Sequence, residues 1–155
     1  MDKIDPWEVK EVKDYNKLMK ELGIDDFSHF AKKLKNAPLE IRRNLVLGHK
    51  DFSKIHDCIT KKKEFAILTG LMPSGVFHFG HMSLINQVIY YQKLGAKIYL
   101  LAADLEAQLT RNIEQKEARR IALEEYLLNY FALGLKKKNL SIFQLQKKCN
   151  HYLKK

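Results

Sequence analysis

Short apolar runs, separated by turn residues and by segments of helical periodicity, organise the chain from residue 64 onward. A continuous apolar run such as 97–103 is typical of a parallel strand that is buried on both faces. Apolar residues spaced by three and four, as at Ile85, Val88 and Ile89, predict a helix with one buried face. The pattern predicts three strands alternating with two helices, over residues 64–69, 79–94, 97–103, 112–133 and 141–145. The expected fold class is therefore α/β, a β-α-β-α-β unit of three parallel strands with right-handed crossovers, as in half of a doubly wound sheet.

The second of these helices has the less regular pattern. Asn112, with Gln115 three residues later, predicts an N-cap and its capping-box partner. Gly134 is placed to end the helix. The apolar positions of its expected buried face are Ala118, Ile121, Ala122, Leu128 and Ala132. Glu125 interrupts that face, and the pattern does not explain it.

The turn after the first predicted strand, residues 70–81, carries the chemistry: Gly-Leu-Met-Pro-Ser-Gly-Val-Phe-His-Phe-Gly-His. A strand, a tight turn and a helix N-terminus form a phosphate site, because unpaired backbone N–H groups and the helix dipole point at the anion. His78 and His81, three residues apart, would share one helical face and donate to the same phosphate oxygens. Gly80 leaves room for a base or ribose against the helix backbone. The alternatives are exposed surface histidines or a metal-binding pair without its other ligands.

The first 63 residues differ in character, because they are rich in charge and predict only short helices, over 14–22, 26–35 and 52–62. We therefore expect a mainly helical N-terminal appendix (1–63), a nucleotide-binding half-domain (64–145) and a basic tail (146–155). Residues 136–155 contain seven lysines and no acidic residue, within a net charge of +10. Such a segment attracts RNA phosphates or is a solvated chain end.

The amino-acid composition further limits the classes of protein to which this chain can belong. A chain of 155 residues that is 46% hydrophobic can bury one sizeable core. No apolar run approaches the roughly 18–20 residues of a membrane span, so no membrane partner is expected. The first residues lack the apolar segment of a secretory signal. Cys58 and Cys149 have neither zinc-site nor disulfide-framework spacing, so we expect no metal site and a cytoplasmic protein.

The His-Phe-Gly-His run at 78–81, with Pro-Ser-Gly at 73–75 ahead of it, resembles the HIGH motif of class I aminoacyl-tRNA synthetases. More narrowly, residues 69–81 are similar to the archaeal–eukaryotic branch of the tryptophanyl-tRNA synthetases. Four segments of the appendix occur in the same order in that branch, at 5–9, 14–18, 42–43 and 49–52. The resemblance runs from about residue 4 to about residue 143. It implies the N-terminal half of the family fold, whose sheet is Rossmann-like (HUP-type).

The resemblance also implies an activity and its residues. The activity is ATP-dependent activation of tryptophan to an aminoacyl-adenylate and transfer to tRNA, with Mg²⁺ carried by the nucleotide. His78 and His81 would be catalytic, acting on the phosphates. The nucleotide-binding residues would be Gly70, Pro73, Ser74, Gly75, His78, Gly80 and His81. The amino-acid-binding residues would be Leu68, Thr69, Leu101 and Glu106, with Glu106 holding the ammonium group.

The chain also departs from the family. Leu68 and Leu101 stand where eukaryotic relatives place a tyrosine and a glutamine against the indole. The second class I signature, Lys-Met-Ser-Lys-Ser, does not occur, and a complete member is more than twice as long. We therefore expect a truncated or split N-terminal part that engages tRNA only together with the C-terminal half, with a complementary half-enzyme or a homodimer as possible partners.

Two alternative functions share these motifs. Tyrosyl-tRNA synthetases also carry Pro-Ser-Gly ahead of H-x-G-H, so a fragment of one is the first alternative. The long appendix and Glu106 favour the tryptophanyl branch over it. A non-catalytic nucleotide- or tRNA-binding paralogue is the second alternative, supported by the missing signature and the basic tail.

Overall fold

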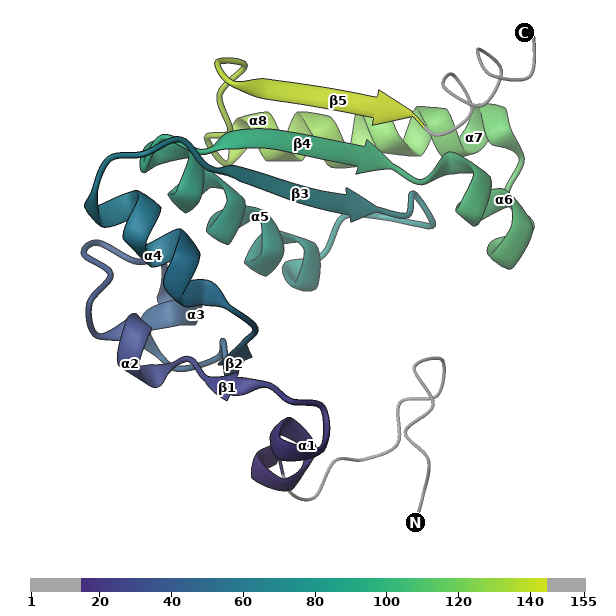
Figure 1. Ribbon diagram of the computed structural model, residues 1–155. Coiled ribbons are helices and arrows are strands. Elements are labelled where there is room, and N and C mark those ends of the chain that lie inside the picture. The colour runs from purple at the N-terminus through teal and green to yellow at the C-terminus, as the bar shows by residue number, and fades with distance from the viewer. Residues whose placement is uncertain (1–14, 145–155) are drawn as a thin grey trace, which may run out of the picture. The chain divides into compact units, whose positions relative to one another are not determined.

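Three parallel strands, β3 (Ala66–Leu71), β4 (Lys97–Ala102) and β5 (Leu140–Gln144), form a sheet in that order in a computed structural model that describes residues 15–144 (Figure 1). The register pairs Thr69 with Leu100 and Leu100 with Ile142. The predicted β-α-β-α-β order is confirmed. β3 extends two residues beyond the predicted strand, so Gly70 belongs to the sheet, opposite Leu101, rather than to the turn.

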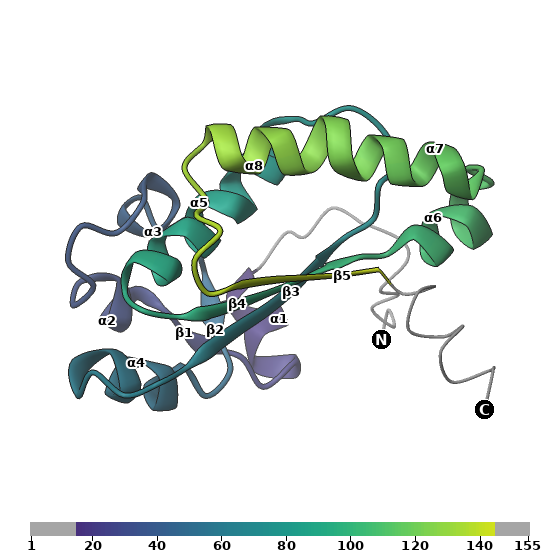
Figure 2. The ribbon, with the colours of Figure 1, turned by 90° about the horizontal axis from the view of Figure 1, so that it is seen from above.

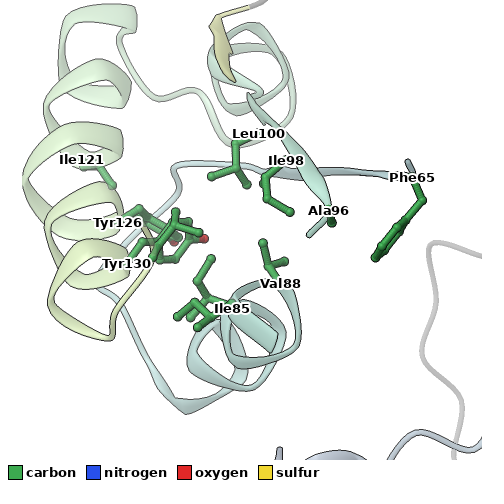
Figure 3. Close-up of a cluster of buried hydrophobic side chains, with 11 residues drawn as sticks. Phe65, Ile85, Val88, Ala96, Ile98, Leu100, Ile121, Tyr126 and Tyr130 are labelled. Carbon is green, nitrogen blue, oxygen red and sulfur yellow. The ribbon is translucent and has the colours of Figure 1, made fainter. Parts of the chain in front are cut away.

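Helices cover one face of this sheet. α5 (Phe79–Lys93) lies beside a continuous rod made of α7 (Gln115–Arg120), η1 (Ile121–Leu127) and α8 (Leu128–Ala132), as Figure 2 shows. The core between them contains Ile85 and Val88 of α5, and Ile98 and Leu100 of β4, all at most 3% exposed (Figure 3). The helix predicted over 79–94 is confirmed, with Leu94 as its C-cap followed by Gly95 at φ 102°.

The N-cap predicted at Asn112 is wrong. An unpredicted helix, α6 (Asp104–Arg111), follows β4, and Asn112 is its C-cap in a left-handed conformation with φ 53°. Asparagine tolerates that conformation because its short side chain can hydrogen-bond locally. α7 begins only at Gln115, with Glu114 in the N-cap position. A polar residue before an apolar run is therefore ambiguous, since it can end one helix as well as begin the next.

The predicted face of the second helix is only half correct, because η1 is a π-helix. Ala118, Ile121 and Ala122 are buried as expected, but Leu128 is 62% exposed. The buried residues after Ala122 are Tyr126 and Tyr130, four and eight positions further on. A π-helical turn contains more residues than an α-helical turn, so residues later in the sequence than an α-helix would predict come to lie on the buried face. This shift accounts for Glu125, which lies beside the buried face rather than on it.

The part of the chain before Ser53 forms a separate compact unit. It contains α1 (Tyr15–Glu21), α2 (Ser28–Ala31) and α3 (Leu39–Arg42), and strands β1 (Asp25–Asp26) and β2 (Gly48–His49), which pair antiparallel. The described part of this unit has more residues in helices than in strands, as expected of the appendix, whose bounds of 1–63 stay a prediction. The helix predicted over 26–35 is shorter, because the Asp26 carboxylate accepts from the backbone N–H of Ser28 at 2.8 Å, which favours a helix start there. Phe27, 2% exposed, contacts Phe30 and Phe52 in the core of this unit.

The second unit begins at Ser53 and includes most of α4 (Phe52–Thr60), the helix predicted over 52–62. Ile55 and Ile59 of α4 pack against the core of the sheet. None of the helices between residues 15 and 144 is both long and apolar enough to cross a bilayer. The basic tail expected at 146–155, and the segment at 5–9 that resembles the family, lie outside the described residues.

Candidate active site

The turn between β3 and α5 lies at the carboxyl end of the sheet, the edge where open α/β sheets bind ligands (Figure 1). Pro73 is fully buried and anchors the turn, Gly75 is half-buried, and Ser74 is exposed. α6, which carries Glu106, starts at the same edge directly after β4. The fold therefore brings the two predicted site segments to one end of the sheet.

His78 and His81 together cap the N-terminus of α5. His78 is the N-cap, with an extended backbone at φ −139° and ψ 175°. Its Nδ1 accepts from the backbone N–H of Gly80 at 3.1 Å, and its own backbone N–H donates to Nδ1 of His81 at 3.3 Å. The two side chains form a reciprocal capping box, a role that serine and glutamate usually fill. The two rings lie close together but tilted, with centroids 3.8 Å apart and their planes at 32° to each other.

These bonds determine which ring nitrogens can donate. A neutral imidazole has one donor and one acceptor nitrogen, and Nδ1 is the acceptor in both rings, so Nε2 carries the proton. His78 is exposed, and its Nε2–H therefore faces a place that a ligand can reach. His81 is half-buried, and its Nε2 lies 3.3 Å from the hydroxyl oxygen of Tyr126. The two histidines thus differ in the donor they offer, which the sequence alone did not indicate.

Gly80 leaves room for the His78 ring. A Cβ at Gly80 would lie 3.0 Å from Cε1 and 3.1 Å from Nδ1 of His78, so the ring would have to move. Gly70 is less constrained, because a Cβ there would lie 3.4 Å from the carbonyl oxygen of Leu101, an ordinary contact distance. A Cβ at Gly75 would meet none of the described atoms within 4 Å.

Three of the predicted binding residues share the open face of the sheet. Gly70 pairs with Leu101, and Leu68 lies two residues before Gly70, so all three lie on the face opposite the helices. Leu68 is 78% exposed there. Thr69 belongs to the other face, because it pairs with the buried Leu100. The sheet thus brings Leu68, Gly70 and Leu101 together and separates Thr69 from them.

α6 holds one exposed and one buried carboxylate in its first turn. Glu106 is exposed, and its backbone carbonyl accepts from the hydroxyl of Thr110 at 2.7 Å. The same hydroxyl lies 3.4 Å from the sulfur of Met72, which connects α6 to the His-bearing turn. Asp104 is 1% exposed, and its carboxylate lies 3.9 Å from Nε of Arg119 in α7. The two opposite charges attract each other between α6 and α7, at a separation longer than a hydrogen bond.

A surface hollow of about 310 Å³ lies beside the histidine cap, lined by Phe77, His78, Phe79 and Met82. Its walls are largely apolar, and Phe79 is 81% exposed. The arrangement can receive a flat apolar group next to an imidazole N–H donor, which is the pattern of many nucleotide sites.

Stability is expected to decrease as the pH falls below about 6.5, the usual pKa of histidine. Burial, and then the neighbouring His78, lower the pKa of His81, so the unfolded chain binds a proton more readily than the folded chain does. The contribution of neutral His81 to the free energy of unfolding is therefore fully present above pH 6.5. This contribution is lost as the pH drops through the lowered pKa of His81.

Urea denaturation at pH 7.5 and 5.5 measures this effect, with His81→Gln as the variant that cannot titrate. The variant should show a smaller difference in unfolding free energy between the two pH values. Equal pH dependence in both proteins would contradict the prediction. The carboxylates whose pKa is lowered are Asp26, Asp57 and Glu117; they titrate below their ordinary values of 3.8 and 4.5, which lie below this range.

Tyr126 is the site residue that the sequence analysis missed. It is 1% exposed, and its ring lies edge-on to the His81 ring with centroids 4.7 Å apart. The expected helical face excluded it, because that face assumed an uninterrupted α-helix. The available signal was the pair of tyrosines at Tyr126 and Tyr130, four residues apart in a helical segment.

Comparison with known families agrees with this geometry. Residues 60–152 match the family model of class I tRNA synthetases (W and Y), more than half of the chain. The chain therefore belongs to this family of class I tRNA synthetases, as the HIGH-like motif predicted.

Tryptophan–tRNA ligases are among the particular members that it matches. The tryptophan–tRNA ligase of Aeropyrum pernix is 43% identical over 146 residues, which are 92% of this chain and 39% of that ligase. The crystal structure of the A. pernix tryptophanyl-tRNA synthetase aligns with a TM-score of 0.75 at 41% identity, over 91% of this chain and 40% of that one. The tryptophanyl-tRNA synthetase from Encephalitozoon cuniculi, crystallised with tryptophan, gives a TM-score of 0.75 at 25% identity, over 91% and 44%. The chain thus spans about 40% of the length of these relatives and corresponds to their N-terminal part.

Proposed function

We propose that this chain is the nucleotide- and amino-acid-binding part of a tryptophan–tRNA ligase. The observation that carries the proposal is the histidine capping box of α5, which presents Nε2–H of His78 and a helix N-terminus at the carboxyl edge of a parallel sheet. The family membership and the tryptophan-specific relatives support the same function.

The reaction would be the activation of tryptophan. A carboxylate oxygen of tryptophan attacks the α-phosphorus of ATP, the bond to the bridging oxygen breaks, and tryptophanyl-adenylate and pyrophosphate are formed. The protein forms no covalent bond, so it acts by positioning the reactants and neutralising negative charge on the phosphates. His78 would donate from Nε2 to a phosphate oxygen, and His81 would hold that ring in place by packing against it.

The other residues have proposed roles in binding. Gly70 and Gly80 would give the nucleotide close access to the backbone, and the turn from Pro73 to Gly75, with the Ser74 hydroxyl, would shape its edge. Glu106 is exposed in the first turn of α6, where its carboxylate would hold the ammonium group of tryptophan. Leu68 and Leu101 would offer an apolar surface to the indole. Thr69, on the other face, would act only by positioning Leu68 and Gly70 next to it.

Mg²⁺ would accompany the nucleotide. The donors at the site are imidazole and backbone N–H groups, which fit phosphate oxygens, whereas Mg²⁺ prefers oxygen ligands and keeps several waters. We propose that the ion is held through the phosphates, that tRNA binds only together with the C-terminal part found in the relatives, and that the protein works in the cytoplasm. The open sheet face with the exposed Leu68 supports a complementary half-enzyme, or a second copy of this chain, as the partner.

Tryptophan-dependent exchange of labelled pyrophosphate into ATP tests the proposal. The 155-residue chain is mixed with the part of the A. pernix ligase that lies beyond the match. Exchange is expected with tryptophan and not with tyrosine, and the 155-residue chain alone is expected to charge tRNA poorly or not at all. Exchange with tyrosine instead would assign the chain to the tyrosine-specific members. ATP binding without any exchange would favour a non-catalytic nucleotide-binding paralogue.

A further inference from the structure

We propose that Tyr126 is a positioning residue for the histidine cap, because its hydroxyl oxygen accepts a hydrogen bond from Nε2 of His81 and fixes that ring in one tautomer. The inference rests on the proposed function only in its consequence for nucleotide binding. The contact itself is a property of the fold: the hydroxyl oxygen of Tyr126 and Nε2 of His81 lie 3.3 Å apart. The two residues are 45 positions apart in the sequence, so the contact joins α5 to η1.

The direction of this hydrogen bond follows from the other bond of the same ring. Nδ1 of His81 accepts the backbone N–H of His78, so in the neutral ring Nδ1 carries no hydrogen and Nε2 does. The hydrogen therefore points from His81 to the phenol oxygen of Tyr126. Burial and the neighbouring His78 lower the pKa of His81, which keeps the ring neutral and this arrangement intact at pH 7.

Tyr126 is itself held on several sides. Its ring is edge-on to Phe77, with centroids 6.1 Å apart, and to Tyr130 at 6.4 Å. The backbone of Ser74 hydrogen-bonds to its hydroxyl, which partly opposes the rise in the pKa of Tyr126 that burial causes. The titratable groups facing His81 are thus His78 from the same cap and Tyr126 from the opposite helix.

The π-helical segment is the reason that Tyr126 reaches the cap. Buried positions recur every fourth residue through Ala118, Ala122, Tyr126 and Tyr130, which the wider π turns of η1 allow. Figure 3 shows Tyr126 and Tyr130 projecting from this helix toward Ile85 of α5. In an α-helix of the same sequence, the expected face would have placed position 125 toward the core. π-bulges occur frequently at functional sites, and here one brings a phenol to a histidine.

As a consequence, the two histidines of the cap have different roles. His81, hydrogen-bonded to Tyr126, supports the adjacent His78 ring, whose Nε2–H remains available to a phosphate. Removing the hydroxyl of Tyr126 leaves Nε2 of His81 without its acceptor, so this ring can turn or change tautomer. His78 would then lose its fixed neighbour.

Nitrogen-15 NMR of the histidine rings of the 155-residue chain tests the inference. At pH above 7 the native chain should show His81 in a single tautomer with the proton on Nε2. A proton on Nδ1 would overturn the proposal without any variant. In Tyr126→Phe, the two ring nitrogen shifts of His81 should move toward each other as the tautomers mix. The matched control is Tyr130→Phe, which removes a hydroxyl from a neighbouring buried tyrosine and should leave His81 unchanged.

Unchanged His81 shifts in a folded Tyr126→Phe chain would also overturn the proposal. ATP titration of the same samples separates the inference from the proposed function. Mixed tautomers together with several-fold weaker ATP binding support the inference in full. Mixed tautomers in a chain whose native form does not bind ATP support the positioning role and contradict the proposed function.

Discussion

Replacing His78 with alanine is expected to weaken ATP binding to the 155-residue chain roughly ten- to hundredfold, and adenosine binding hardly at all. Hydrogen bonds to charged groups contribute about 1.5–3 kcal/mol, and about 1.4 kcal/mol corresponds to a factor of ten. The difference between the two ligands arises because only the triphosphate would meet Nε2–H of His78. Isothermal titration calorimetry, or NMR titration where binding is weak, measures both affinities.

The control must account for the second role of His78 as N-cap of α5. An alanine at an N-cap costs about 0.5–2 kcal/mol of stability, so His78→Ala also weakens the helix start. Asparagine is a good N-cap residue and lacks the imidazole, so His78→Asn should restore stability without restoring ATP affinity. His56→Ala, in α4, controls for the loss of a histidine elsewhere in the same unit. ATP affinity equal to that of the native chain in both His78 variants would show that the site has been assigned wrongly.

Replacing Leu100 with alanine is expected to lower the free energy of unfolding by about 2–5 kcal/mol. Leu100 is 2% exposed in β4 and packs in the core between the sheet and the helices, so its loss removes buried apolar surface and leaves a cavity. Leu68→Ala is the matched control, because it is the same substitution in the neighbouring strand on the open face. It should change the unfolding free energy by no more than about 0.5 kcal/mol.

Urea denaturation with a common slope analysis measures both changes. Similar losses for the two variants would show that Leu68 is covered in solution, by a second copy of this chain or by another polypeptide. Sedimentation of the purified chain at tens of micromolar would then show whether it self-associates, so that a second copy covers Leu68. A small loss for Leu100→Ala alone would contradict the described core.

The strands and the site motif could be read from the sequence because both depend on local patterns. An apolar run such as 97–103 needs only its own residues to indicate a buried parallel strand, and the structure places β4 there. The turn from Pro73 to His81 has its strand before it and its helix after it, so the phosphate-site interpretation was also local. The family could be predicted for the same reason, since the motif is contiguous.

The arrangement of the two histidines could not be read in this way. The sequence placed His78 and His81 on one helical face as equivalent donors, but His78 is the N-cap of α5, and its Nδ1 is used in capping the helix. Which ring keeps a free N–H then depends on Tyr126, which is 45 positions away. Spacing along one helix carries no information about a partner on another.

The α/β class, the order of the strands, the turn that carries the HIGH-like motif and the family follow from the amino-acid sequence alone. Each of these rests on residues that are neighbours in the chain, whose periodicity and turn chemistry are fixed before any packing occurs. Three features depend on packing in the folded chain: Asn112 ends α6, η1 is π-helical, and Tyr126 contacts His81. These features differ from the local ones because a helix packed against a sheet must fill the space left by its neighbours. The buried face then follows the shape of the core, where Tyr126 and Tyr130 fit, rather than the regular period of an isolated α-helix.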